Sequence, residues 1–155
     1  MKFINKILVP SIQILPKGVV KVFANKYIAG DKLSDAVKTV KLLNEKKLMA
    51  TVDVLGESIS DKKEAIKSKD ENISVLDAIK NNNLQCNLSI KLTMLGLQID
   101  YDFCKSMVKE ILVRAKEINC FVRIDMEDSS VTDLTIRIFE EAKKDFENLG
   151  IVIQA

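Results

Sequence analysis

The feature that most constrains this sequence is a regular alternation between helical patterns and short runs rich in β-branched residues. The β-rich runs begin at residues 48, 88, 120 and 151, and helical patterns over 31–47, 61–81, 101–119 and 131–149 precede them. Gly150 would end the last of these helices as a C-cap. Strands that alternate with helices are typical of a parallel sheet, so we expect an α/β fold.

Polar residues recur at similar places in these strands. Asp53, Lys91, Asp125 and Gln154 follow one another at intervals of 38, 34 and 29 residues. A (β/α)8 TIM barrel uses about 250 residues for eight units, or roughly 31 for each. Four strands cannot close such a barrel. We therefore expect an N-terminal half-barrel over residues 31–155, which ends inside its fourth strand and is preceded by a helical lead-in over 1–30.

Strand parity separates a barrel from an open, doubly wound sheet. Each run has one apolar face, formed by Ala50/Val52/Val54, Ile90/Leu92/Met94, Val122/Ile124/Met126 and Ile151/Ile153. The opposite faces carry Thr51/Asp53, Ser89/Lys91/Thr93, Arg123/Asp125/Glu127 and Gln154. An open sheet covered by helices on both sides would show nearly continuous apolar strands. The alternation favours a barrel with helices outside and a polar lumen.

Charged side chains in this lumen are costly unless they are paired or used. Lys91 and Asp125 fall on adjacent strands and could neutralise each other, while Arg123 and Glu127 flank Asp125 on the same face. The pattern fits either an interior network of salt bridges or a ligand site. Lys91 and Asp125 lie toward the carboxyl ends of their strands, where such barrels place their chemistry, and this favours the ligand site.

Composition excludes several classes of function. The chain has no histidine, which excludes Ser-His-Asp catalysis and the H-E-x-x-H zinc motif. The three cysteines, Cys86, Cys104 and Cys120, form no C-x-x-C pair, so we expect no metal site and reduced thiols in a cytoplasmic protein. A net charge of +2 gives no sign of nucleic-acid binding. Glycine-rich phosphate motifs are also missing.

The amino terminus is apolar but interrupted by charges and prolines. Its longest uncharged run, residues 7–16, is too short to span a bilayer. We expect a helical lead-in that packs on the domain. A segment that lies on a membrane surface stays open as an alternative, and with it a location peripheral to the inner membrane.

Several short segments together resemble the FAD-dependent proline dehydrogenase family. They are residues 51–57 (TVDVLGE), 89–97 (SIKLTMLGL), 122–127 (VRIDME) and 151–155 (IVIQA), with 27–30 (YIAG) and 132–135 (TDLT) in support. The similarity runs from about residue 23 to the end of the chain. The resemblance implies a (β/α)8 barrel that holds FAD over its carboxyl-terminal mouth. Its expected reaction is oxidation of L-proline to pyrroline-5-carboxylate, with electrons passed to a quinone.

The resemblance also implies roles for individual residues. Lys91 matches the active-site lysine near the substrate carboxylate. Asp125 matches the active-site aspartate, which helps to hold an arginine beside the flavin. Met126 and Gln154 match positions that contact the flavin of FAD, whereas Asp53 and Glu57 match the first-strand motif and are expected to be structural. The family's later strands, with its remaining FAD contacts and its arginine pair for the proline carboxylate, fall beyond residue 155, so we expect this chain alone to be inactive.

Two other readings remain open at this level. One is a non-catalytic half-barrel that needs a separate C-terminal half or self-association, because its edge strands would otherwise be open. The other is an unrelated barrel enzyme that uses Lys91 for Schiff-base chemistry, which needs a lysine with a lowered pKa. A nearby carboxylate such as Asp125 opposes that chemistry, because it raises the pKa of a lysine.

Overall fold

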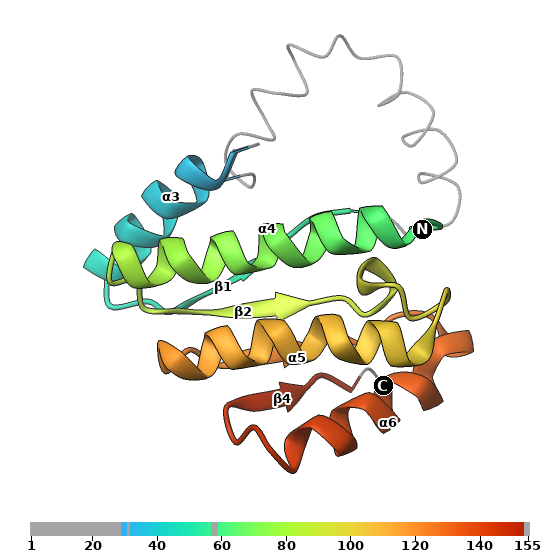
Figure 1. Ribbon diagram of the computed structural model, residues 1–155. Coiled ribbons are helices and arrows are strands. Elements are labelled where there is room, and N and C mark those ends of the chain that lie inside the picture. Colours follow the sequence, from blue (N-terminus) through green and yellow to red (C-terminus); the bar gives the residue numbers. More distant parts are fainter. Residues whose placement is uncertain (1–28, 31, 57–58, 154–155) are drawn as a thin grey trace, which may run out of the picture.

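A computed structural model describes residues 29–30, 32–56 and 59–153 as a parallel four-stranded sheet with the strand order β1-β2-β3-β4. The elements are α3 (Leu33–Glu45), β1 (Ala50–Asp53), α4 (Lys62–Asn81), β2 (Cys86–Ile90), the 3-10 turn η1 (Thr93–Leu95), α5 (Tyr101–Glu117), β3 (Val122–Ile124), the 3-10 turn η2 (Ser129–Val131), α6 (Thr132–Lys143) and β4 (Leu149–Ile151). Helices α4, α5 and α6 lie side by side along the sheet (Figure 1). The expected α/β fold with parallel strands is confirmed.

The strand register places like residues in the same row across the sheet. Val52 pairs with Leu88, Leu88 with Val122, and Val122 with Leu149. The last three of these side chains are buried at 1% exposure or less, and they face the helices. Because side chains alternate along a strand, the next row points to the opposite face. That row contains Asp53, Ser89, Arg123 and Gly150, so the expected division into an apolar and a polar face is confirmed for the described strands.

The core forms where the helices meet the apolar rows. Leu76 of α4, Leu112 of α5 and Ile138 of α6 are fully buried in one cluster with Leu88 and Ile124 of the sheet. Full burial of such a side chain contributes roughly 1.5–3 kcal/mol to stability. This one-sided core leaves the opposite face of the sheet to charged and polar groups.

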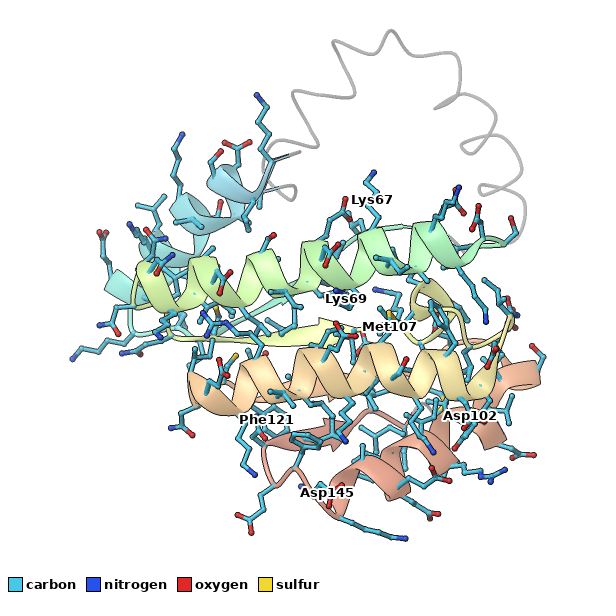
Figure 2. The ribbon with its side chains drawn as sticks, in the orientation of Figure 1. Lys67, Lys69, Asp102, Met107, Phe121 and Asp145 are labelled. Atoms are coloured by element: carbon cyan, nitrogen blue, oxygen red, sulfur yellow. The ribbon has the colours of Figure 1, made fainter. Side chains whose placement is uncertain are left out.

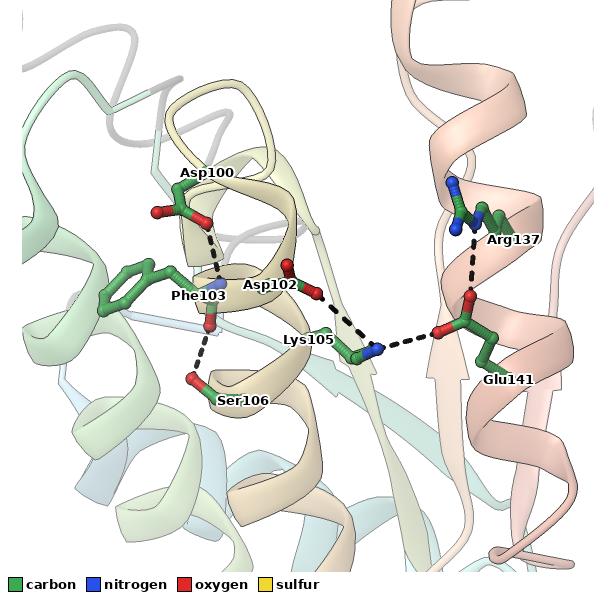
Figure 3. Close-up of polar contacts among 7 residues, drawn as sticks. All are labelled: Asp100, Asp102, Phe103, Lys105, Ser106, Arg137 and Glu141. Atoms are coloured by element: carbon green, nitrogen blue, oxygen red, sulfur yellow. Dashed lines mark hydrogen bonds and ion pairs between the residues drawn. The ribbon is translucent and has the colours of Figure 1, made fainter.

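Charged contacts join neighbouring helices outside the core. Lys67 on α4 points away from the molecule, whereas Lys69 lies toward α5 (Figure 2) and pairs with Glu110 of α5 at 3.1 Å. Lys105 of α5 pairs in turn with Glu141 of α6 at 2.9 Å (Figure 3). These contacts tie α4, α5 and α6 together in sequence order.

Several of the predicted element boundaries are wrong, and β1 and β3 are shorter than the expected strands over 48–56 and 120–127. The helix expected to reach residue 149 ends at Lys143, and Gly150 lies inside β4 rather than at a helix C-cap. The Lys143 ammonium donates to the carbonyl oxygens of Glu147 and Leu149, which stabilises a turn between α6 and β4. A Cβ at Gly150 would lie 2.5 Å from Cζ of Phe121, so the glycine makes room for that ring.

The second expected strand also stops early. It was expected to run from 88 to 95, but β2 ends at Ile90 and the chain turns into η1, so Leu92 and Met94 are not strand residues. Gly96, at φ +90°, closes the turn in the left-handed region that favours glycine. The carboxylate of Glu127, beyond the end of β3, accepts a hydrogen bond from the backbone N–H of Thr93 and so stabilises the turn.

Candidate functional site

The polar face of the sheet gathers charged side chains where the strands end. Asp53 is the last residue of β1, while Lys91 and Asp125 come directly after β2 and β3. Because the carboxyl ends of parallel strands meet at one edge, these residues share one rim of the sheet. Arg123, inside β3, points to the same face as Asp125 because it lies two residues before it. We call these four residues and Ser89 the luminal cluster.

Lys91 pairs with Asp53 rather than with Asp125. Its ammonium donates a hydrogen bond to Oδ2 of Asp53 across the β1–β2 pair. Oδ1 of Asp53 is buried and has no hydrogen-bond partner among the described residues. The pairing of Lys91 with Asp125 that the sequence suggested is therefore wrong, although both residues lie on the expected face.

Asp125 instead holds Arg123. Its Oδ1 accepts a hydrogen bond from Nε of Arg123 at 2.9 Å, and Nη2 of the same arginine donates to Oγ of Ser89 at 3.1 Å. The backbone N–H of Asp125 donates to the carbonyl oxygen of Ile90 at 2.9 Å, which fixes the aspartate relative to β2. The guanidinium is thus fixed from two strands.

Glu127 has a role that the sequence did not reveal. Its carboxylate accepts hydrogen bonds from the backbone N–H of Thr93, at 3.0 Å, and from the Thr93 hydroxyl. It was expected simply to flank Asp125 on the polar face. One signal could have indicated this contact: Glu127 is a carboxylate two residues beyond Asp125, and the preceding strand ends in a Thr-Met-Leu-Gly sequence typical of a turn.

Met126 lies half-buried between Asp125 and Glu127. Gln154, expected to contact the flavin, and Glu57 of the first-strand motif lie outside the described residues. The structure thus brings three of the four expected site residues, Lys91, Asp125 and Met126, to one rim.

The cysteines have no role in this cluster. Burial raises the pKa of Cys104 to about 12, with a smaller contribution from the charge of Glu127, and burial also raises that of Cys86 to about 11. Such thiols stay protonated near neutral pH and are poor nucleophiles. The described part of the chain contains no group of three His, Cys, Asp or Glu residues placed to hold a metal ion.

The parallel sheet with its helices and its charged rim defines an α/β protein of barrel type. Comparison with known proteins makes this specific, because the family model of proline dehydrogenase matches residues 36–155. The chain belongs to the proline dehydrogenase family. The earlier resemblance is confirmed.

Named relatives agree with this assignment. Proline dehydrogenase 1 of Bacillus subtilis (strain 168) is 42% identical over 132 residues, which make up 85% of this chain and 44% of the relative. Proline dehydrogenase 2 of the same strain is 34% identical over 135 residues, covering 87% and 45% of the two chains. This chain therefore spans less than half the length of these relatives.

A solved structure shows the same arrangement of elements. The crystal structure of proline utilization A from Bdellovibrio bacteriovorus, inactivated by N-propargylglycine, has a TM-score of 0.80 and 25% identity. The match covers 89% of this chain and 18% of that protein. Proline utilization A from Corynebacterium freiburgense gives a TM-score of 0.64 at 25% identity, over 81% and 14% of the two chains. The described residues therefore form the expected portion of a barrel-type domain.

Proposed function

We propose that this chain supplies the first half of the catalytic barrel of an FAD-dependent proline dehydrogenase, which oxidises L-proline to pyrroline-5-carboxylate. The observation that carries the proposal is the luminal cluster, in which Lys91 and Arg123 are held by separate aspartates at one rim of a parallel sheet. Paired cations that face a lumen suit a small substrate with a carboxylate.

The residues of this rim also fit a flavin. Met126 follows Asp125 directly after β3 and is half-buried, and the cations of the luminal cluster can donate hydrogen bonds to the polar edge of the ring. We propose Met126 and Gln154 as residues that contact FAD. When bound, FAD supplies a two-electron acceptor for the hydride of proline.

Lys91 would bind the carboxylate of proline. An ammonium has three N–H donors, so one can stay on Asp53 while the others are available to the substrate. Asp125 would hold the Arg123 guanidinium in place and balance its charge. Together the two pairs would orient proline without leaving an unpaired charge in the lumen.

Other parts of the proposal rest on separate grounds. A quinone as electron acceptor rests on the family resemblance, a cytoplasmic location on the reduced cysteines, and the division into a lead-in over 1–30 and a half-barrel over 31–155 on the spacing of the helical and strand patterns. Within the described residues, no helix is both long enough and apolar enough to cross a bilayer.

A second function is favoured by the open edges of the sheet. In the described part of the chain, β1 and β4 each pair with one strand only. Met49, Leu55 and Ile153, beside these edges, are 74%, 88% and 78% exposed. A cavity of about 660 Å³ also opens beside β1, lined by Val52, Leu55 and others. We therefore keep a non-catalytic half-barrel, completed by a partner half or by a second copy, as the alternative.

A fusion protein tests the proposed function. Residues 1–155 are joined to the part of Proline dehydrogenase 1 of Bacillus subtilis that follows the matched region. The proposal predicts a yellow flavoprotein that reduces an electron-accepting dye when proline is added. A folded fusion that binds flavin but leaves the dye oxidised would refute the catalytic role and favour the alternative.

A further inference from the structure

We propose that Asp53 is the positioning residue for Lys91, so that the first strand sets where the substrate-binding ammonium stands. Asp53 was expected only to have a structural role in the first-strand motif. The inference rests on the proposed function, since Lys91 is there assigned to the proline carboxylate.

The strand register brings the two side chains together. Asp53 pairs with Ser89, and Lys91 follows Ser89 by two residues, so both side chains point to the same face of the sheet. The long Lys91 side chain spans this diagonal and donates to Oδ2 of Asp53. The Lys91 side chain is 25% exposed and that of Asp53 is 28% exposed. By comparison, the Lys67–Glu71 pair on the helix surface is 78% and 47% exposed, and exposed pairs of that kind contribute little.

The other two carboxylates that the structure describes at the rim are already engaged. Asp125 accepts from Arg123, and Glu127 accepts from both donors of Thr93. Among the described residues, Asp53 makes the one ion pair of Lys91 that lies within 4.0 Å. In the described part of the chain, Asp53 is therefore the carboxylate that sets the place of the Lys91 ammonium.

Only one oxygen of the Asp53 carboxylate accepts a hydrogen bond from the described residues. Its Oδ2 accepts from Lys91, whereas its Oδ1 is buried without a hydrogen bond. A buried acceptor without a partner carries a free-energy cost. A carboxylate kept at this cost beside one ammonium is better explained by a role in holding that ammonium than by general support of the fold.

The first test measures how fast an amine-specific reagent labels Lys91 in the whole chain, read residue by residue by mass spectrometry. In Asp53→Asn the ammonium loses its ionic partner, and we expect labelling of Lys91 to rise about fivefold or more. Asp53→Glu should restore slow labelling. Asp77→Asn is the matched control, because it breaks a comparable ion pair, with Arg114, between α4 and α5. Lys67 and Lys109 report any general loosening of the fold, and their labelling should not change.

Unchanged labelling of Lys91 in Asp53→Asn would overturn the inference, as would an equal rise in Asp77→Asn. The second test uses the fusion protein. There Asp53→Asn should raise KM for proline about tenfold, with a smaller change in kcat, because the carboxylate contact exists in ground and transition states alike. A fall in kcat alone would contradict the positioning role. An inactive fusion would refute the proposed function, whereas the labelling result would still decide whether Asp53 holds Lys91.

Discussion

Glu127 and Thr93 join the carboxyl end of β3 to the turn that follows β2. The glutamate carboxylate accepts from both the backbone N–H and the hydroxyl of Thr93, and Thr93 is 5% exposed. The turn that Glu127 stabilises begins two residues after Lys91. The same turn places Met94 against Gly56, where a Cβ would lie 2.2 Å from the methionine Cε. One carboxylate therefore helps to fix the rim that displays the luminal cluster.

Replacing Glu127 by Ala should lower the free energy of unfolding by about 1–3 kcal/mol, because two buried donors of Thr93 lose their acceptor. Urea denaturation monitored by circular dichroism measures this change. Glu140→Ala, on the exposed side of α6, is the control and should stay within about 0.5 kcal/mol of the unchanged chain. Equal stability of the two variants would show that the Glu127–Thr93 contact is not structural.

The stability of the chain should fall in acid partly through Glu141. Hydrogen bonds from Lys105, first, and also from Arg137 lower the pKa of Glu141 below its ordinary 4.5, against the opposing effect of burial (Figure 3). A carboxylate with a lowered pKa in the folded state stabilises the fold above its unfolded pKa, and this contribution is lost as pH falls. Glu141→Gln should therefore show a shallower loss of thermal stability below pH 4.5 than the unchanged chain. A steeper loss in the variant would contradict this sign.

The chain by itself should bind FAD weakly or not at all. Met126 and Gln154 are the two flavin contacts that the resemblance assigns to it, and cofactor affinity depends on a closed, preformed cavity. Absorbance of the purified protein, compared with its flavin content after denaturation, measures this. A stoichiometric yellow flavin spectrum would contradict the prediction and would support assembly of two half-barrels into one site.

Lys91→Ala in the fusion protein should act mainly on KM for proline, because the carboxylate contact that it removes is made in both ground and transition states. Steady-state kinetics with varied proline separates KM from kcat. Lys109→Ala, on the outer surface of α5, is the control and should leave both constants unchanged. A loss confined to kcat would show that Lys91 has a different role.

The faces of the strands could be predicted from the sequence, but the partners of the luminal cluster could not. Alternation of apolar and polar residues places Asp53, Lys91 and Asp125 on one face, because side chains alternate along a strand. It cannot tell whether Lys91 reaches toward β1 or β3, since both neighbours present a carboxylate. Lys91 pairs toward β1 because the carboxylate after β3, Asp125, already accepts a hydrogen bond from Arg123.

Element ends were harder to predict because contacts between distant residues decide them. The residues after Ile90 continue an apolar alternation, yet they form a turn. Glu127, 34 residues further along the chain, stabilises this turn by accepting a hydrogen bond from Thr93. Gly150 resembles a helix C-cap in the sequence, but the space taken by the Phe121 ring explains the glycine. Local pattern carries no information about either contact.

The most direct test of the proposed function is the kcat/KM of the fusion protein carrying Asp125→Ala, measured on well-folded enzyme beside the unchanged fusion. Removing Asp125 leaves the Arg123 guanidinium without its carboxylate. In a fully buried pair this costs about 3–5 kcal/mol, and the cost is lower here because the two side chains are 34% and 21% exposed. Part of this should appear in catalysis, so we expect kcat/KM to fall at least ~100-fold, or about 2.7 kcal/mol of transition-state stabilisation. A variant that is less stable yet keeps turnover within about threefold of the unchanged fusion would show that Asp125 is scaffolding and would contradict the assignment of the luminal cluster to proline oxidation.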